Sequence, residues 1–486
     1  MFMAMAFAMP ASAVDWLFDP YVGGTATYTD NVNQSPTNEE SSMILSLTPG
    51  FTLRSEGSRR VQATMQYGLS GVARFGGDDS GDLYHNLSAT GQAELIEDFL
   101  YIDGNARVSQ EIISLQGSQA DALINDSNRT TAGSYSISPY IKKRFGSFAD
   151  AQARYTLSGI LFGEDALSDL LTNAFSASLD SGTRFNTLTW GLDYSYRDVA
   201  GQNTATGDTS YSYERADLSL GYALSRTFRL IGSFGHEWVE YQSVAAAAND
   251  RDDSNWSAGF SWSPSRRTSF EATMGERFNG ETYYVSAQHR ARTSTWNLSY
   301  AEDFSDISQA TLTEGTVYYY LCGSEFVATQ FQIPPDSSCI YLGSQTGLIP
   351  SLAEGLYISK TMRAGVSWGI SKITYTINAF DVQRYFVGDG SEDRSQGITG
   401  AMNYRMAANT TFNGSLALIR NQEPSNIPGL GINQEDDILT LTAGLGHQLG
   451  PRTSSALTFR HTQRDSNIPA AEYTENNLTA SFNMSF

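Results

Sequence analysis

The chain has 486 residues, of which 40% are hydrophobic and 12% aromatic, and its formal net charge at pH 7 is −21. The mean hydropathy is −0.31, and no apolar run reaches the roughly 18 residues that a membrane-spanning helix needs, which excludes a helical membrane protein. The negative charge, with no basic cluster to oppose it, argues against nucleic-acid partners.

The segment 1–13 is apolar and ends in Ala11-Ser-Ala13, a pattern typical of a signal-peptide cleavage site. It lacks the basic stretch that usually opens such a peptide, so either the true start lies upstream or the signal is atypical. We interpret the segment as a signal-peptide remnant rather than as a short apolar tail. Export exposes thiols to oxidising conditions, which favours a disulfide between the two cysteines, Cys322 and Cys339.

From residue 19 onward, segments of roughly 12 to 15 residues alternate apolar with small polar side chains and are separated by turn residues. This pattern predicts an all-β chain with about 22 strands, between about 20 and 24, in a single antiparallel up-and-down barrel of the outer-membrane type over 14–486. The predicted strands lie near 19–32, 41–54, 59–74, 82–96, 98–112, 131–144, 147–162, 171–183, 186–199, 208–223, 226–241, 253–263, 267–279, 280–291, 294–305, 355–369, 371–387, 392–406, 409–422, 435–449, 452–465 and 472–486.

Short and long connections alternate along the chain. Tight turns near 55–58, 145–147 and 225–226 contrast with long polar links near 31–40 and 115–129. Short periplasmic turns and long external loops characterise barrels of the bacterial outer membrane, and this arrangement leaves both termini in the periplasm. A soluble propeller or solenoid would repeat at a fixed length, which this chain does not do.

The carboxyl-terminal strand shows the alternation without a break. Leu478, Phe482 and Phe486 fall on one face, whereas Asn477 and Ser485 fall on the other. A terminal phenylalanine on the apolar face resembles the signal that the barrel assembly machinery reads, so Phe486 is the predicted assembly signal.

The same alternation assigns the other strands two faces. Trp190, Trp262, Trp296 and Trp368 lie near strand ends, where they could form interfacial girdles or simply favour strand formation. Lys360 falls on the lipid-facing phase at mid-depth, which predicts a bulge or a register error there.

The opposite phase carries charges of both signs. Such a wall would suit hydrated, weakly charged solutes such as saccharides, but any water-filled barrel needs a hydrophilic interior. The net negative charge then resides in the loops, close to outer-membrane lipid and lipopolysaccharide. The predicted lumen-facing residues are Arg54, Arg74, Asp103, Arg107, Asp150, Arg154, Asp193, Asp217, Arg229, Glu271, Arg277, Arg290, Arg363 and Arg460.

The longest connection, 305–352, is a predicted extracellular loop. It contains two apolar runs: the first, 317–322, ends at Cys322, and the second, 339–342, begins at Cys339. A Cys322–Cys339 disulfide would staple them into a hairpin and stabilise it by about 3 kcal/mol. Exposed tyrosines and leucines disfavour a flexible loop in water, so the hairpin either narrows the lumen or forms a rigid surface loop.

Catalytic motifs are missing from the sequence. Its five histidines are scattered, and no metalloprotease, nucleophile-elbow or paired Cys/His spacing is present. We therefore expect no enzyme activity, no cofactor and no metal site, although a site built from dispersed strands would escape a motif search.

The segments 18–32, 264–283 and 288–303 are similar to those of the outer-membrane β-barrel family associated with exosortase/PEP-CTERM systems and exopolysaccharide loci. This resemblance implies a non-enzymatic conduit in exopolysaccharide secretion or PEP-CTERM-type surface export, with periplasmic and inner-membrane polysaccharide-export partners. The alternatives are a general diffusion porin for small hydrophilic solutes and a structural outer-membrane anchor. We expect no separate plug domain ahead of the barrel.

Overall fold

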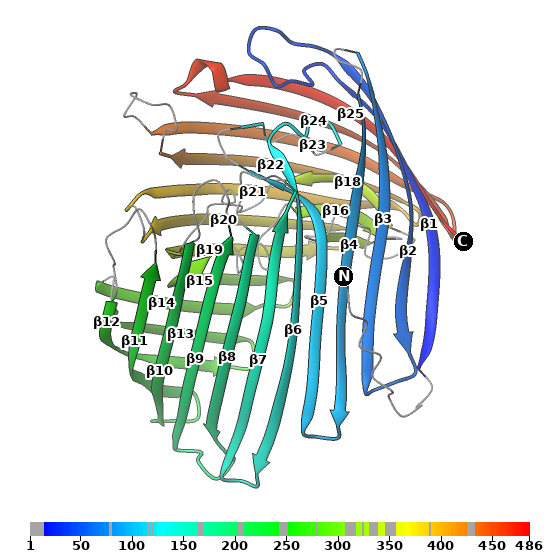
Figure 1. The fold of residues 1–486 in the computed structure, drawn as a ribbon. Helices are drawn as coiled ribbons and strands as arrows, with labels where there is room; N and C mark the ends of the chain where they lie inside the picture. Colours follow the sequence, from blue (N-terminus) through cyan, green and yellow to red (C-terminus); the bar gives the residue numbers. More distant parts are fainter. Residues whose placement is uncertain are drawn as a thin grey trace.

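The computed structural model describes residues 14–76, 80–113, 117–118, 121, 123–163, 169–202, 209–242, 251–277, 280–306, 317–322, 325–329, 339–345, 356–387, 390–424 and 433–486. Twenty-two antiparallel strands form one sheet in which chain neighbours pair. Because β1 (Asp15–Thr29) also pairs with β25 (Tyr473–Ser485), the sheet closes into a barrel (Figure 1). The predicted fold class is confirmed, and the predicted signal-peptide remnant lies outside the described residues.

The strand bounds follow the alternating segments of the sequence. A single 3₁₀ turn, Pro469–Ala471, precedes the last strand. Within the described ranges, no helix is long and apolar enough to cross a membrane. The other barrel strands are β2 (Ser42–Glu56), β3 (Val61–Phe75), β4 (Ser80–Ile96), β5 (Leu100–Ile112), β6 (Arg129–Phe145), β7 (Ala149–Phe162), β8 (Asp169–Ser181), β9 (Leu188–Gln202), β10 (Thr209–Ala223), β11 (Phe228–Gln242), β12 (Arg251–Ser265), β13 (Thr268–Arg277), β14 (Gly280–Arg290), β15 (Ser294–Asp306), β19 (Leu356–Ile370), β20 (Ile373–Phe386), β21 (Glu392–Ala407), β22 (Thr410–Glu423), β23 (Gln434–Gly450) and β24 (Thr453–Ser466).

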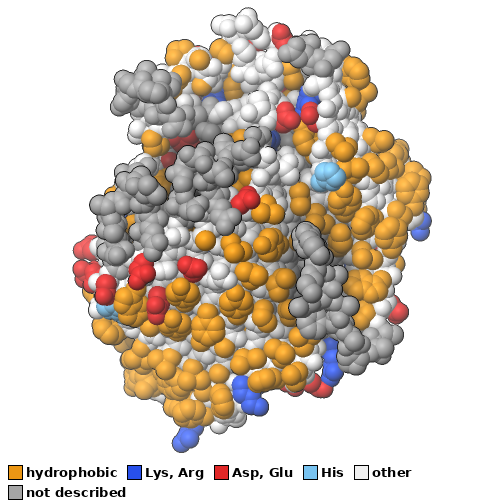
Figure 2. Space-filling view, in the orientation of Figure 1, with side chains coloured by type: hydrophobic (Ala, Val, Ile, Leu, Met, Phe, Trp, Pro, Cys, Tyr) orange, Lys and Arg blue, Asp and Glu red, His pale blue; other side chains and the backbone are white. Residues whose placement is uncertain are grey.

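The two faces of the sheet differ in polarity. On β25, Phe482 is 42% exposed on the outside, whereas its neighbours Ser481 and Asn483 are buried on the inside. The same contrast recurs around the ring, and Figure 2 shows apolar side chains spread over the outer surface. A bilayer stabilises a barrel that has an apolar exterior and a polar interior.

The connections sort by length between the two ends of the barrel. The end with short turns, such as 57–60, 146–148 and 451–452, also holds Asp15 and Phe486, and we call it the turn end. The other, the loop end, carries the long connections such as 30–41 and 424–433, but also the two-residue connection between β13 and β14.

Aromatic side chains gather at the turn end. The predicted girdle tryptophans all lie there: Trp262 and Trp296 are exposed outward, Trp190 packs with Phe148, and Trp368 stacks on a tyrosine. Rings that contact both lipid and water are typical of a bilayer interface, so the turn end marks one membrane boundary.

The register of β19 contradicts one prediction. The pairing of β19 with β15 and β20 runs without a shift, so there is no bulge at Lys360. Lys360 does lie on the outward phase, where its Nζ is 3.9 Å from a carboxylate oxygen of Glu302. A cross-strand carboxylate near the loop end, rather than a register error, accommodates the charge.

The long connection between β15 and β19 contains a second sheet. It has three strands, β16 (Val317–Cys322), β17 (Glu325–Thr329) and β18 (Cys339–Gln345), in the order β17-β16-β18. β18 lies against β24 and β25, whose outward side chains are exposed and whose inward ones are buried. The sheet therefore occupies the lumen beside this wall (Figure 1), and the predicted two-stranded hairpin is a three-stranded sheet instead.

Candidate functional site: the barrel lumen

All fourteen predicted lumen residues lie on the inward phase of their strands, opposite to the exposed apolar side chains. They are spread around the ring rather than gathered at one point. By strand they are Arg54 of β2, Arg74 of β3, Asp103 and Arg107 of β5, Asp150 and Arg154 of β7, Asp193 of β9, Asp217 of β10, Arg229 of β11, Glu271 and Arg277 of β13, Arg290 of β14, Arg363 of β19 and Arg460 of β24.

Many inward charges form ion pairs. Arg154 donates to Asp103 at 2.9 Å, and the Arg107 guanidinium lies 3.3 Å from Glu111. Arg54 lies 3.6 Å from Asp19. Because the paired charges largely cancel, the lumen wall presents hydrogen-bonding groups without a strong field of one sign, which suits solutes that carry hydroxyls and little charge.

Two fully buried pairs escaped the sequence prediction. Arg464 of β24 donates to Asp436 of β23 at 2.6 Å, and both side chains are at most 3% exposed. Arg384 of β20 pairs in the same way with Asp393 of β21. Each pair lies near the loop end and inside the predicted strands, and the two-residue alternation would have placed all four residues on the inward phase.

Described residues of the link between β5 and β6 also lie in the lumen. Arg74 Nε donates to the carbonyl of Ile124 at 3.0 Å, and the Tyr84 hydroxyl donates to Asp126 at 2.6 Å. From the opposite side of the β1–β25 junction, Arg464 donates to the carbonyl of Gly117 at 2.8 Å. The sequence showed only a long polar link here. In the structure its described residues bridge β3, β4 and β24 across the loop end.

This bridge is held by an apolar cluster as well. Ile124 packs with Val32, Ile44, Val72 and Tyr84, all of them buried. An apolar cluster on the inward phase of β2 and β3 is otherwise unexpected in a wet lumen, so these side chains explain why the link turns inward instead of extending into solvent.

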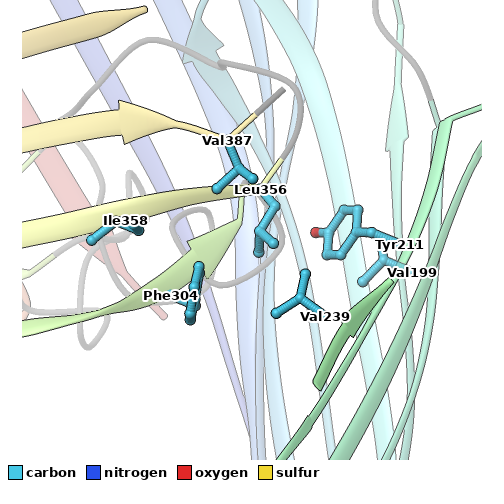
Figure 3. Packing of buried hydrophobic residues seen from close by; sticks show 7 residues of the cluster. All are labelled: Val199, Tyr211, Val239, Phe304, Leu356, Ile358 and Val387. Carbon is cyan, nitrogen blue, oxygen red and sulfur yellow. The ribbon is translucent and has the colours of Figure 1, made fainter. Parts of the chain in front are cut away.

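A second apolar cluster joins strands that are not neighbours in the ring. Figure 3 shows Val199, Tyr211 and Val239 of β9–β11 facing a group from β15, β19 and the residue after β20, namely Phe304, Leu356, Ile358 and Val387. The barrel is therefore pinched at the loop end between these two parts of its wall.

Below this pinch the lumen holds a cavity of about 360 Å³. Hydroxyls of Ser158, Ser176 and Ser195 share its lining with Tyr213 and Arg215. Aromatic rings, hydroxyls and guanidinium groups at one site can stack on and hydrogen-bond to sugar-like or phosphate-bearing molecules.

A stacked group follows the inner wall of β5 to β7. The Tyr101 and Tyr140 rings are stacked at 5.2 Å, and the Arg154 guanidinium lies 3.9 Å from the Tyr140 ring centroid. Gln92 donates to the Tyr140 hydroxyl at 2.8 Å. Because Arg154 also pairs with Asp103, the group is held rigidly against the wall.

No group of three or more His, Cys, Asp or Glu side chains suited to a metal ion occurs in the part of the chain that the structure describes. The neighbouring carboxylates Glu392 and Asp393 face opposite sides of β21, since Glu392 is exposed and Asp393 buried. They cannot share one cation. The backbone register places Cys322 of β16 directly opposite Cys339 of β18.

Comparison with solved structures agrees with this geometry. The chain is similar to the FrpB iron transporter from Neisseria meningitidis (10% identity, TM-score 0.54, covering 96% of this chain and 82% of that one). It is also similar to the siderophore receptor PirA from Acinetobacter baumannii (10%, TM-score 0.51, 96% and 80%) and to the ferric citrate transporter FecA (9%, TM-score 0.51, 96% and 78%).

No family model matches the chain, and no curated protein does. At these identities the structural likeness shows the fold alone. The protein has the barrel fold of these outer-membrane proteins, and its apolar exterior around a polar interior is the arrangement expected of an outer-membrane barrel.

Proposed function

We propose that the protein is a non-enzymatic outer-membrane conduit through which a surface polysaccharide leaves the cell. The observation that carries the proposal is the character of the inner wall, where charges are mostly paired and hydroxyls, amides and tyrosine rings remain to contact a solute. A neutral or weakly charged glycan can hydrogen-bond to such a wall and slide along it without being trapped by a strong field.

The contents of the lumen support a gated conduit over a general diffusion porin. A three-stranded sheet lies against β24 and β25 inside the barrel, and described residues of the β5–β6 link cross its loop end. An unobstructed lumen of this many strands would pass antibiotics and bile freely, so a barrel that admits a polymer only at times needs internal elements of this kind.

The sequence resemblance to exopolysaccharide-locus barrels supports the same proposal. It implies periplasmic and inner-membrane partners that would deliver the polymer to the turn end. The structurally similar proteins include an iron transporter and a siderophore receptor, but at 10% identity this likeness concerns the fold and does not carry their substrates to this chain.

The test is a gene deletion with quantification of surface polysaccharide and of small-solute uptake. We expect surface polysaccharide to fall, polymer to accumulate in the periplasm, and uptake of nutrients to stay unchanged. Normal secretion by the deletion strain would contradict the proposal. Impaired nutrient uptake with normal secretion would favour the diffusion porin.

A matched pair of variants tests the wall itself. Arg154→Gln removes both the ion pair to Asp103 and the contact with the Tyr140 ring, whereas Tyr155→Phe changes the next residue, which faces outward and is 43% exposed. In planar bilayers, we expect purified polysaccharide to block current through the Tyr155→Phe protein as through wild type and to block Arg154→Gln more weakly.

A further inference from the structure

The hydrogen-bonded ladder of the barrel stops short between β14 and β15, as it also does between β4 and β5 beyond Leu87 and Val108. β14 pairs with β15 only over Val285–Arg290 and Thr295–Tyr300, six residues on each strand. The ladder ends there, although β14 begins at Gly280 and β15 continues to Asp306. Neighbouring barrel strands normally pair along their length because unsatisfied backbone groups are costly beside lipid.

The β13–β14 hairpin is also short. Its strands have ten and eleven residues, against fifteen in β12. Pairing of β12 with β13 begins at Trp256, so β12 extends past the hairpin toward the loop end. The wall therefore has a notch above the hairpin, bounded by β12 on one side and β15 on the other.

Among the described residues, side chains of β11, β15 and β19 meet across this notch. Phe304 and Ile358 lie on the outward phase of β15 and β19, the phase of the exposed Leu298 and Met362. Val239 lies on the inward phase of β11, and yet all three of the buried side chains share one cluster (Figure 3). The tips of β15 and β19 therefore lie on the lumen side of β9–β11, and their outward faces pack against the inward face of β9–β11. We call this overlap the seam.

One arginine spans the seam. Arg277, the last residue of β13, donates to Glu237 of β11 at 2.7 Å and to Asp303 of β15 at 3.1 Å. It also donates to the backbone carbonyl of Glu302 at 3.3 Å. A side-chain contact of this kind separates more easily than a strand ladder, because no row of backbone groups loses its partners at once.

Different environments lie on the two sides of the seam. On the lumen side, Phe304, Asp303 and Leu356 form one wall of the 360 Å³ cavity that also holds Ser176 and Arg215. The cavity thus offers hydroxyls and a guanidinium group directly behind the seam.

The lipid side of the same wall is hollowed. A groove of about 700 Å³ crosses the outer faces of β12–β15, β19 and β20, and it is lined by large side chains such as Phe260 and Leu298 over a floor that includes Ala287 and Ala364. Ala287 pairs with Leu298, two residues from the end of the ladder at Val285 and Tyr300. The groove therefore comes within two residues of the point where the β14–β15 ladder stops, and it lies on the same outward phase of β15 and β19 that carries Phe304 and Ile358 farther along the strands.

We propose that the seam is a lateral portal for a membrane amphiphile: the acyl chain stays in the lipid-facing groove while a head group with hydroxyl or phosphate oxygens enters the lumen cavity. The groove is continuous with the apolar surface that contacts the bilayer, which commits its occupant to a lipid chain. The cavity on the inner side supplies the polar partners that such a head group needs. This portal does not depend on the polymer proposed above.

The test measures head-group entry by fluorescence quenching. A fluorescent unnatural amino acid replaces Ser176, which lines the cavity on β8. A second variant carries it at Ser415, an inward residue at a similar depth on β22, on another part of the ring. Both proteins are reconstituted in phosphatidylcholine vesicles that contain phosphatidylcholine with a nitroxide on the head group.

We expect the lipid-borne nitroxide to quench the fluorophore at position 176 several-fold more strongly than at 415. A water-soluble nitroxide-choline, which has no chain, should quench both through the lumen. Equal quenching of the two positions by the lipid probe, or no quenching at 176, would overturn the portal.

Closing the seam provides the second arm. The rings of Tyr213 and Phe304 lie 5.4 Å apart across the seam. Both residues are replaced by cysteine in a chain whose two native cysteines are replaced by serine, and a short bismaleimide joins the new pair. The control joins Ser219→Cys to Ser233→Cys, which already oppose each other in the β10–β11 ladder. The seam crosslink should abolish quenching of the fluorophore at 176 by the lipid probe but not its quenching by nitroxide-choline. The control crosslink should leave both kinds of quenching unchanged. Unchanged lipid quenching in a seam-crosslinked, heat-modifiable barrel would also refute the portal.

Discussion

At the scale of single residues, burial rather than charge decides which side chains matter to this barrel. The exposed pair Arg420–Asp437 lies on the outside near the loop end, with side chains 50% and 55% exposed. The pair Arg464–Asp436 lies on the inside of neighbouring strands and is almost fully buried. Water screens the first pair, whereas removing one member of the second leaves a charge without compensation.

Arg464→Ala should therefore destabilise the folded barrel by about 3 to 5 kcal/mol, because Asp436 stays buried and the carbonyl of Gly117 loses its donor. The matched variant Arg420→Ala should leave stability unchanged within error. The measurement is urea-induced unfolding in lipid vesicles, followed by tryptophan fluorescence. Equal losses in the two variants would show that burial of the ion pair is not what stabilises this wall.

The last two residues provide a second pair. Phe486 is 56% exposed on the outward face and Ser485 is 7% exposed on the inward face. If Phe486 is the assembly signal, Phe486→Ser should strongly reduce the heat-modifiable form in the outer membrane, whereas Ser485→Ala should have little effect. Similar losses from the two changes would show that the assembly machinery does not read this face.

At the scale of elements, the three-stranded sheet in the β15–β19 connection is the part most suited to control flow. Its strand β16 pairs with both β17 and β18, and β18 lies against β24 and β25. The sheet is thus attached to the wall at β24 and β25 by packing and is linked covalently to β15 and β19, on another part of the ring. Removing it should widen the pore without breaking any barrel strand.

A disulfide between Cys322 and Cys339 fits the register, because residues directly opposite in an antiparallel pair have Cα atoms about 4.5 to 5.5 Å apart. Replacing both cysteines by serine should raise single-channel conductance in planar bilayers and sensitise cells to large antibiotics, since a loop of this size loses about 3 kcal/mol of stabilisation. Reduction of the wild type with dithiothreitol should reproduce the increase. Deleting 317–345 sets the upper limit, and an unchanged conductance in that deletion would show that another element closes the channel.

At the scale of the whole molecule, the alternation of apolar and polar side chains and the positions of the turn residues were enough to predict the barrel architecture. A period of two residues assigns inward and outward faces locally, so the fourteen lumen residues required no knowledge of distant contacts. The inward position of the described residues between β5 and β6, the β14–β15 break and the seam could not be predicted. They depend on contacts between residues far apart in the sequence, such as Arg74 with the carbonyl of Ile124 or Val239 with Phe304.

An asymmetry between the two ends of the barrel predicts its orientation in the membrane. At the turn end the outer surface is aromatic, with Trp262 and Trp296 exposed. Near the loop end the outward phase of β20–β23 becomes charged, with Arg394 paired to Asp381 and Arg420 to Asp437. The strands therefore project beyond the apolar belt at the loop end only, which is expected of the extracellular side, where loops are long and lipopolysaccharide supplies polar groups.

Surface labelling tests this orientation in intact cells. Asn38→Cys at the loop end and Arg59→Cys at the turn end both stand at exposed positions, so their accessibility should differ only through the membrane. A maleimide reagent too large for the outer membrane should label Asn38→Cys in intact cells and Arg59→Cys only after the cells are opened, with the unsubstituted chain as the background for the native cysteines. The reverse result would invert the barrel and place the loop end, with the seam beside it, in the periplasm. A membrane amphiphile would then meet the portal from the inner leaflet, so this experiment also decides which leaflet the portal serves.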